Sequence, residues 1–320
     1  MRPSNRRKDS CKKEPATRRM ATAGLDAKPK TVMCSAMNIA LLIASLLFGG
    51  TSLTKADDDP VLVGAGDIAD CTTSGAAATA TLLDHIPGTV FTAGDNVYPD
   101  GTVEEFRTCY GATWGRHLAR TRPSPGNHDY HAADARPYYA YFGARAGEPG
   151  RGYYSYELGE WHIVALNSNL GADAEAVQEQ WLRGDLTAHR VPCTLAYWHH
   201  PLFSSGAGHG SDPRLRPLWQ VLAEFGADVV INGHDHDYER FAPQTPDGQA
   251  DAVRGMREFV VGTGGATLGV FGLPHANSEV RKSGTWGVLK LTLHPTSYDW
   301  EFVSAADGSF HDSGSTVCVP

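Results

Sequence analysis

The sequence predicts an α/β layered fold, on three observations. Short apolar runs alternate with helical stretches along residues 57–320. Most of these runs are almost continuously apolar, which is typical of strands buried on both faces. Strand-then-helix alternation favours helices layered against a sheet. After Gly284 the pattern changes to alternating polar and apolar residues, which indicates an antiparallel pair of strands.

Each expected element follows from its local pattern. The apolar runs predict strands over 61–65, 89–93, 161–166, 194–198, 228–231 and 258–261. The stretches between them predict helices over 74–83, 174–187 and 214–225. The antiparallel pair is expected over 287–293 and 298–303, joined by 294–297. Neither an internal repeat nor a low-complexity linker interrupts the region, so we expect a single domain over residues 57–320.

Residues 1–56 have the pattern of a targeting segment. Basic residues are followed by the uncharged stretch 31–54, whose apolar centre is 39–48. Thr54-Lys-Ala56 then resembles a small-residue cleavage site. This order predicts a secretory signal peptide and a secreted or extracytoplasmic protein.

An uncleaved signal anchor is the alternative, because the uncharged stretch of 24 residues is long enough to span a bilayer. The preceding basic residues would keep the N-terminus inside and place residues 57–320 outside. Met20 or Met33 is a possible true start, and Arg18-Arg19 hints at twin-arginine export although it lies far from the apolar centre.

The charge argues against nucleic acid as the main partner. The chain of 320 residues has a formal net charge of −8, with 28 Lys and Arg against 36 Asp and Glu. Residues 1–56 carry 11 basic and 3 acidic side chains, so residues 57–320 carry 17 and 33. A domain this acidic repels a phosphate backbone.

Chemically active side chains follow the expected strands. The motifs are Gly66-Asp67, Gly94-Asp-Asn-Val-Tyr98, Gly126-Asn-His-Asp129, Tyr197-Trp-His-His-Pro201 and Gly233-His-Asp-His236. In open α/β sheets ligands bind at the carboxyl ends of strands. Each motif alone is an ordinary turn or cap. Together they offer too many oxygen and nitrogen donors for one tetrahedral zinc, and they favour a two-metal site in which a carboxylate is shared.

The four cysteines beyond the leader predict two disulfides, as expected outside the cytoplasm. Cys71 and Cys109 follow the first two motifs, on neighbouring strand ends, and are expected to pair. Cys193 begins the strand that leads to His199, and its pairing with Cys318 would attach the C-terminus to the sheet. Four buried free thiols are the alternative.

These motifs resemble the calcineurin-like metallophosphoesterases and, within them, the purple acid phosphatases. The resemblance runs from about Val61 to the C-terminus. Gly94-Asp-Asn-Val-Tyr98 and Gly233-His-Asp-His-Asp-Tyr-Glu-Arg240 are the sharpest matches. It implies a β-sandwich flanked by helices, in αββα layers, with a single metallophosphoesterase catalytic domain.

One departure from the wider superfamily is informative. Many relatives carry Asp-x-His at the first motif, whereas this chain has Asp67-Ile-Ala69. Purple acid phosphatases also lack that histidine and use a tyrosine three residues after the second-motif aspartate, where this chain has Tyr98. A phenolate favours a trivalent ion, so the resemblance implies Fe(III) there and a divalent ion (Fe, Zn or Mn) beside it. The alternative is that Tyr98 only packs over its loop.

The resemblance also implies the ligands. Carried over by motif, the first metal takes Asp67, Asp95, Tyr98 and His236, and the second takes Asp95, Asn127, His199 and His234. Asp95 bridges, because two nearby cations repel unless an anion lies between them. In Gly-His-x-His the imidazoles of an extended chain would point to opposite faces, so this loop must turn.

The neighbouring histidines have different expected roles. The family motif His-x-Pro selects His199 as a ligand, which leaves His200 to packing or support. His128 resembles the histidine that contacts substrate phosphate, and His209 falls at the spacing of a second one, although exposure without function is the alternative for it. Asp129 and Asp235 are expected to orient ligands.

The expected function is hydrolysis of phosphate monoesters by a metal-activated hydroxide, with a small phosphate ester as substrate. A phosphodiesterase or nucleotide hydrolase uses the same site and is one alternative. A non-catalytic, metal-binding module is the alternative of another class. A membrane contact is expected only through an uncleaved anchor, and the sequence leaves the oligomeric state open.

Overall fold

A computed structural model describes residues 59–306, 308 and 310–319. The expected signal peptide or anchor over 1–56, with its uncharged stretch 31–54, lies outside the described residues. Within the described part, none of the helices has both the length and the apolar character needed to cross a bilayer.

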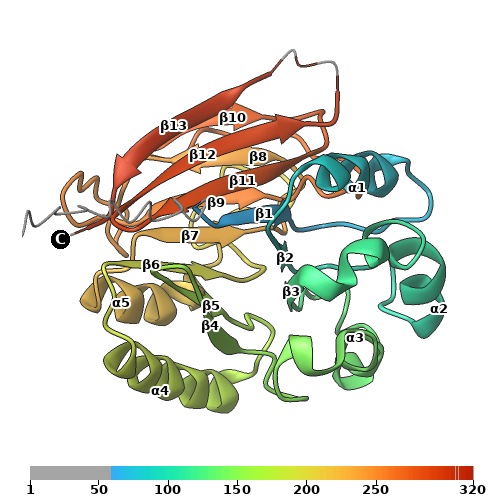
Figure 1. Ribbon diagram of the computed structural model, residues 1–320, viewed down its shortest axis with the longest axis horizontal. Coiled ribbons are helices and arrows are strands. Elements are labelled where there is room, and N and C mark those ends of the chain that lie inside the picture. The colour runs from blue at the N-terminus through green and yellow to red at the C-terminus, as the bar shows by residue number, and fades with distance from the viewer. Residues whose placement is uncertain (1–58, 307, 309, 320) are drawn as a thin grey trace, which may run out of the picture. The chain divides into compact units, whose positions relative to one another are not determined.

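Two β-sheets form the centre of the domain (Figure 1). The first sheet has the order β13-β12-β11-β1-β2-β3 and the second has the order β10-β8-β9-β7-β6-β5-β4. The strands of the first sheet are β1 (Val61–Ala65), β2 (Thr89–Ala93), β3 (Thr121–Ser124), β11 (Gly287–His294), β12 (Ser297–Ser304) and β13 (Asp312–Val317). Those of the second are β4 (Tyr154–Leu158), β5 (Trp161–Ala165), β6 (Cys193–Tyr197), β7 (Val229–Asn232), β8 (Tyr238–Phe241), β9 (Arg257–Val261) and β10 (Ser278–Lys282).

Each sheet contains a parallel part. In the first sheet β1, β2 and β3 are parallel, and in the second β5, β6, β7 and β9 are parallel. Antiparallel strands complete both sheets, including the hairpin of β11 and β12. The parallel strands are the ones whose carboxyl ends carry the motifs, so their direction decides where the candidate site forms.

The sheets pack face to face with helices outside them. Between the sheets, the rings of Phe91 and Tyr197 lie 5.7 Å apart, as do those of Trp161 and Tyr298. Helices α4 (Ala172–Ala188) and α5 (Arg216–Glu224) bury apolar side chains against the other face of the second sheet. Helix α1 (Gly75–His85) packs on the first sheet (Figure 1). The predicted fold, a β-sandwich flanked by helices, is confirmed.

The expected elements agree with the structure where the sequence pattern is strong. β1 and β2 have the predicted bounds, and α1, α4 and α5 begin or end within two residues of theirs. His294 pairs with Ser297, so the expected connection between β11 and β12 is a tight turn. The sequence analysis missed β3, β4, β8, β10 and β13, and also the short helices α2 (Val103–Glu105) and α3 (Arg136–Phe142).

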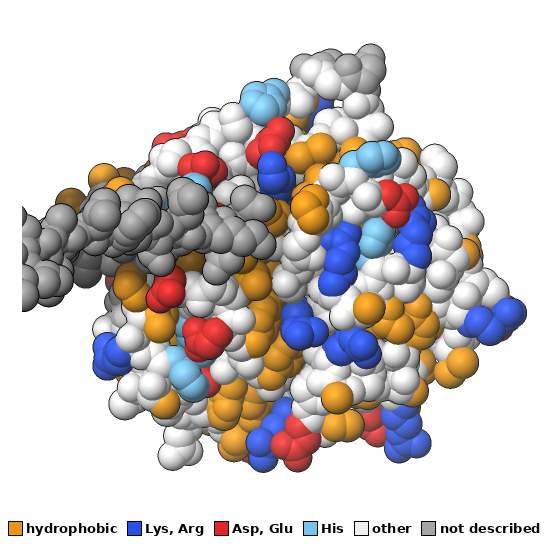
Figure 2. Space-filling view, in the orientation of Figure 1, with side chains coloured by type: hydrophobic (Ala, Val, Ile, Leu, Met, Phe, Trp, Pro, Cys, Tyr) orange, Lys and Arg blue, Asp and Glu red, His pale blue; other side chains and the backbone are white. Residues whose placement is uncertain are grey.

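On the face shown in Figure 2, lysine and arginine side chains stand as separate spots among uncharged surface. Acidic side chains lie between and beside them. This dispersed pattern differs from the continuous basic stripe that follows a nucleic-acid backbone.

Both expected disulfides are present, in the predicted pairing. Cys71 is bonded to Cys109, and Cys193 is bonded to Cys318. The second bond closes a loop with a sequence separation of 125 residues. The C-terminal segment is held further by the Val319 amide, which donates to the carboxylate of Asp228.

Removing the second disulfide should lower the free energy of unfolding. We expect a Cys193→Ala/Cys318→Ala double variant to lose roughly 2–4 kcal/mol, because the open chain gains conformational entropy in the unfolded state. Urea denaturation of both proteins under oxidising conditions measures the difference. Wild-type protein treated with a thiol reductant is the comparison, and an unchanged unfolding midpoint in the variant would contradict the prediction.

Candidate metal centre

Five loops converge at the carboxyl ends of the parallel strands. Three of the loops follow β1, β2 and β3 of the first sheet, and two follow β6 and β7 of the second sheet. These loops bring together all of the expected metal ligands: Asp67, Asp95, Tyr98, Asn127, His199, His234 and His236. Neither sheet alone supplies the whole set, so the site depends on the packing of one sheet against the other.

The first group of donors surrounds the hydroxyl of Tyr98. This oxygen lies 2.7 Å from Asp67 Oδ1, 2.9 Å from Asp95 Oδ2 and 3.2 Å from His236 Nε2. His236 Nε2 is also 3.2 Å from Asp67 Oδ1. These are the four residues that the resemblance assigns to the first metal.

The second group surrounds Nε2 of His199. This nitrogen lies 3.0 Å from Asn127 Oδ1, 3.1 Å from His234 Nδ1 and 3.3 Å from Asp95 Oδ2. Oδ2 of Asp95 is therefore the atom common to both groups. A carboxylate in this position is suited to lie between two cations.

Three of the expected ligands have a strained backbone. Asp67, Asp95 and His234 have φ values of 59°, 47° and 73°, in the left-handed region. A residue with a side chain adopts this region at a cost of roughly 1–2 kcal/mol. Strain of this kind concentrates at functional sites, where the surrounding structure holds it. At His234 the left-handed conformation makes the turn that the Gly-His-x-His motif requires.

The motif glycines allow close approach between the loops. A Cβ on Gly126 would lie 2.1 Å from both the amide nitrogen and Oδ1 of Asp95. A Cβ on Gly94 would lie 2.5 Å from Nδ1 of His199. A side chain at either position would displace a donor from its group.

We expect Gly126→Ala to weaken metal binding and to reduce kcat/KM about 10²-fold, because a displacement near 1 Å in a catalytic group can have an effect of that size. Metal analysis and steady-state kinetics measure both. Gly184→Ala is the control, since a Cβ there meets nothing within 4 Å in the middle of α4. Equal metal content in the two variants would show that the approach at Gly126 does not position Asp95.

The protonation equilibria of the two groups respond to their carboxylates. Burial alone would lower the pKa of His199, but the adjacent Asp95 carboxylate raises it to about 9. Burial alone would also lower the pKa of His236, but the adjacent Asp67 carboxylate raises it to about 9. Each carboxylate is thus balanced by positive charge on an imidazole. A metal cation supplies the same compensation.

At Tyr98 and His234, by contrast, the pKa shifts favour the uncharged form of the side chain. Burial and the negative charges of Asp67 and Asp95 raise the pKa of Tyr98 well above its usual range. Burial and the neighbouring His199 lower the pKa of His234 far below its usual range. A lowered pKa favours the neutral imidazole, which is the form that binds a metal. Tyr98 becomes a phenolate only beside a strong positive charge.

The donor chemistry fits a two-metal centre. Ligand atoms of Asp67, Asp95 and His199 lie within 4.8 Å of one another. Carboxylate, phenol, amide and imidazole donors together suit first-row transition ions such as iron, manganese and zinc.

Residues 61–238 match the model of the calcineurin-like phosphoesterase family, which covers more than half of the chain. The chain belongs to the calcineurin-like phosphoesterases. Residues 256–313 match the C-terminal model of the iron/zinc purple acid phosphatase-like proteins. Within its family, the chain is therefore similar to the purple acid phosphatases.

The curated relatives are also named as purple acid phosphatases. Purple acid phosphatase 15 of Arabidopsis thaliana is 30% identical over 161 residues, which cover 45% of this chain and 30% of the relative. Purple acid phosphatase 18 of the same plant is 27% identical over 232 residues, which cover 66% and 51%. A third, named probable inactive purple acid phosphatase 1, is 29% identical over 154 residues, which cover 44% and 24%. The chain thus spans about half or less of the length of these relatives.

Solved structures show the same fold. A purple acid phosphatase from yellow lupin (Lupinus luteus) seeds superposes with a TM-score of 0.66 at 20% identity, covering 81% of this chain and 53% of that one. A Plasmodium protein described as the anchor in the inner membrane complex superposes with a TM-score of 0.62 at 14% identity, covering 82% and 89%.

In this member of the family, the adjacent histidines 199 and 200 make different contacts. Nδ1 of His200 lies 2.7 Å from the hydroxyl of Ser168, which also accepts the amide of His200. Burial and the charge of His199 lower the pKa of His200 to about 3. The ring of His200 packs against that of His234 at a tilt of 54°, with centroids 4.3 Å apart. These contacts favour His199 as the ligand and His200 as its packing partner.

The two expected substrate histidines lie at the rim of the candidate centre. Nδ1 of His128 is 2.6 Å from the carbonyl of Pro99, and its Nε2 is 3.9 Å from Asp95 Oδ2. His209 is exposed, and its ring lies 4.1 Å from that of His234. His131 also bonds the Pro99 carbonyl, and its ring is 4.5 Å from that of His128.

The carboxylates of Asp129 and Asp235 accept hydrogen bonds from backbone amides of the site loops. Asp129 Oδ2 accepts the amides of Gly126 and Asn96 at 2.9 and 3.2 Å. Asp235 accepts the amides of His209 and Gly210 at 3.1 and 2.9 Å. Asp235 therefore positions the loop that carries His209. The sequence analysis did not anticipate this contact or the support of His200 by Ser168, and each joins residues distant in the chain.

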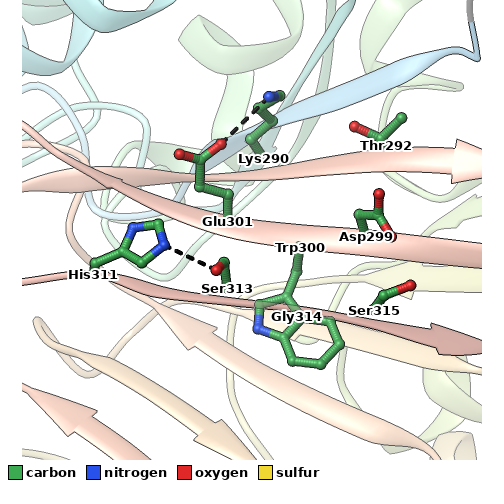
Figure 3. A pocket seen from close by; sticks show the side chains of 9 residues that line it. All are labelled: Lys290, Thr292, Asp299, Trp300, Glu301, His311, Ser313, Gly314 and Ser315. Carbon is green, nitrogen blue, oxygen red and sulfur yellow. Dashed lines mark hydrogen bonds and ion pairs between the residues drawn. The ribbon is translucent and has the colours of Figure 1, made fainter.

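A polar groove on the first sheet is separate from the candidate centre. Figure 3 shows its lining side chains, which come from β11, β12, β13 and the residue His311. None of the expected metal ligands or rim histidines lines it.

Proposed function

We propose that this chain is a two-metal phosphatase that hydrolyses small phosphate monoesters outside the cytoplasm. The observation that carries the proposal is the pair of donor groups that share Oδ2 of Asp95. The similarity to purple acid phosphatases supports the same conclusion.

The proposed ligands form two sets, one for each metal ion. Asp67, Tyr98 and His236 would hold one ion, for which Tyr98 favours Fe(III), and Asn127, His199 and His234 would hold a divalent ion (Fe, Zn or Mn), with Asp95 between them. When bound, two such ions lower the pKa of a water molecule and neutralise the charge of the phosphate.

His128 would contact the substrate. Its Nδ1–H donates to the carbonyl of Pro99, which leaves Nε2 directed toward Asp95. The ring of Tyr98, with its centroid 4.4 Å away, limits rotation of the imidazole. In the imidazolium form, Nε2–H would donate to a phosphate oxygen or protonate the departing alkoxide oxygen. His209 approaches from the opposite loop and would give a second contact.

The proposed location rests on two features. The chain has two disulfides, and disulfide bonds persist in oxidising compartments. Residues 1–56 have basic residues, an apolar stretch and a small-residue site in the order typical of a secretory signal. Determining the N-terminus of protein recovered outside the cytoplasm distinguishes a cleaved signal from an anchor.

A substrate panel tests the activity. Full-length protein loaded with iron and zinc should turn over p-nitrophenyl phosphate at least about tenfold faster than bis(p-nitrophenyl) phosphate, by kcat/KM, a difference of about 1.4 kcal/mol in activation free energy. Asp95→Asn, assayed in the same way, gives the background. Faster turnover of the diester would assign a phosphodiesterase. Two bound metals without turnover of either ester would assign a non-catalytic module.

A further inference from the structure

A second cluster of metal-ligating side chains lies away from the candidate centre. It joins His162, the second residue of β5, to Asp185 and His189 at the end of α4. The candidate centre lies beyond the carboxyl ends of the parallel strands, whereas His162 is near the amino end of its strand. The two clusters therefore occupy different ends of the second sheet.

The ligand atoms of this cluster are already close together. Nε2 of His162 lies 2.7 Å from Asp185 Oδ2, and Nδ1 of His189 lies 3.4 Å from Asp185 Oδ1. The same Nδ1 of His189 bonds the Asp185 backbone carbonyl at 2.9 Å, and the two imidazole rings are stacked with centroids 4.7 Å apart, so the His189 ring must turn before both imidazoles can face one ion. One ligand atom from each of the three residues lies within 4.8 Å of the others. The side chains of His162 and Asp185 are only 1% and 8% exposed, whereas His189 is 44% exposed and gives access from solvent.

Neighbouring side chains orient these donors. Glu157 Oε1 lies 2.7 Å from Nδ1 of His162, and the hydroxyl of Ser155 donates to Asp185 Oδ1 at 2.7 Å. A carboxylate on one imidazole nitrogen fixes the proton there and leaves the other nitrogen to bind a metal, an arrangement common around protein-bound zinc. Asp185 and His189 are four residues apart, so they project from the same side of the end of α4.

We propose that His162, Asp185 and His189 form a third metal site, which binds one Zn²⁺ ion with solvent completing the coordination. Two imidazole nitrogens and one carboxylate are a donor set typical of zinc. The ion takes the place of the proton on Nε2 of His162, which passes to solvent, while Nδ1–H of His162 keeps its hydrogen bond to Glu157. His189 binds through Nδ1 as the neutral tautomer protonated on Nε2, which ends the bond between Nδ1 and the Asp185 carbonyl. The ion joins the end of α4 to β5, so its role is structural.

Metal analysis with zinc alone tests the proposal. After saturation with Zn²⁺ and dialysis against metal-free buffer, wild-type protein should retain one more equivalent than His189→Ala. His85→Ala is the matched control, because His85 ends α1 and its Nδ1 bonds the Thr81 carbonyl at 2.9 Å, as that of His189 bonds Asp185. His85→Ala should retain the wild-type amount.

Three further measurements test the position of the ion, its support by Glu157 and its independence from the candidate centre. Anomalous scattering at the zinc edge should show a peak about 2.0–2.1 Å from Nε2 of His162. The dissociation constant for this equivalent should rise at least about tenfold in Glu157→Gln, which keeps the ligands and changes only the carboxylate behind them. Phosphatase activity should be the same in His189→Ala and wild type. Equal zinc in His189→Ala and wild type, or no peak at His162, would overturn the proposal.

Discussion

Replacing Asp95 with asparagine should remove both ions from the candidate centre and reduce kcat/KM at least about 10³-fold, a loss of about 4 kcal/mol of transition-state stabilisation. The same oxygen, Oδ2, faces Tyr98 at 2.9 Å and His199 at 3.3 Å, so its loss affects both groups. Asparagine keeps the size of the side chain but loses the negative charge that separates two cations. Metal analysis and steady-state kinetics measure the two effects.

The adjacent histidines provide the control for this assignment. His199→Ala should lose the second metal, because Nε2 of His199 is in contact with Asn127, His234 and Asp95. His200→Ala should keep both metals, because Nδ1 of His200 is occupied by Ser168. If His200→Ala lost metal while His199→Ala kept it, the choice of ligand in the His-His-Pro motif would be wrong.

Tyr98→Phe should abolish visible colour. We expect iron-loaded wild-type protein to absorb in the visible through charge transfer from the Tyr98 phenolate to Fe(III). The variant keeps the ring, and only the hydroxyl at the centre of the first donor group is lost. It should retain about one metal ion per chain, held by Asn127, His199 and His234. An absorption spectrum and metal analysis of the same sample measure both results.

Tyr138→Phe is the control for the loss of a buried phenol. Tyr138 is fully buried, and its hydroxyl has no hydrogen-bond partner among the described residues. This variant should keep the colour and both metals. A wild-type enzyme that is colourless, free of iron and fully active would refute the iron assignment and leave the two-metal hydrolase in place.

The fold was predictable where burial dictates composition. β1 and β2 are apolar because both faces are covered, and this pattern gave their bounds. β3 contains Pro123, which is tolerated because the strand lies at the edge of its sheet. β13 is polar and is held by pairing with β12. Strand formation at β3 and β13 depends on a neighbour that no local pattern specifies.

The candidate site was predictable for a related reason. Most of the expected ligands lie in loops after strands that the sequence predicts, and the parallel topology brings these loops together. Asn127 follows β3, which was not predicted, so its motif alone identified it. The cluster of His162, Asp185 and His189 had no such signal. His162 and His189 are separated by the whole of α4, and each alone resembles an ordinary histidine in a strand or at a helix end. Only the docking of α4 on the second sheet makes them neighbours.

The origin of the donors in both sheets has a consequence for biosynthesis. Asp67 and Asp95 emerge from the ribosome early, whereas His199, His234 and His236 follow only after most of the domain has been made. Strand β11, which pairs with β1, emerges later still. The growing chain must therefore reach His236 before it contains the first donor group, and His234 before it contains the second. In zinc fingers a metal drives a short peptide to fold, whereas here we expect an ion to be loaded only after the two sheets have packed together.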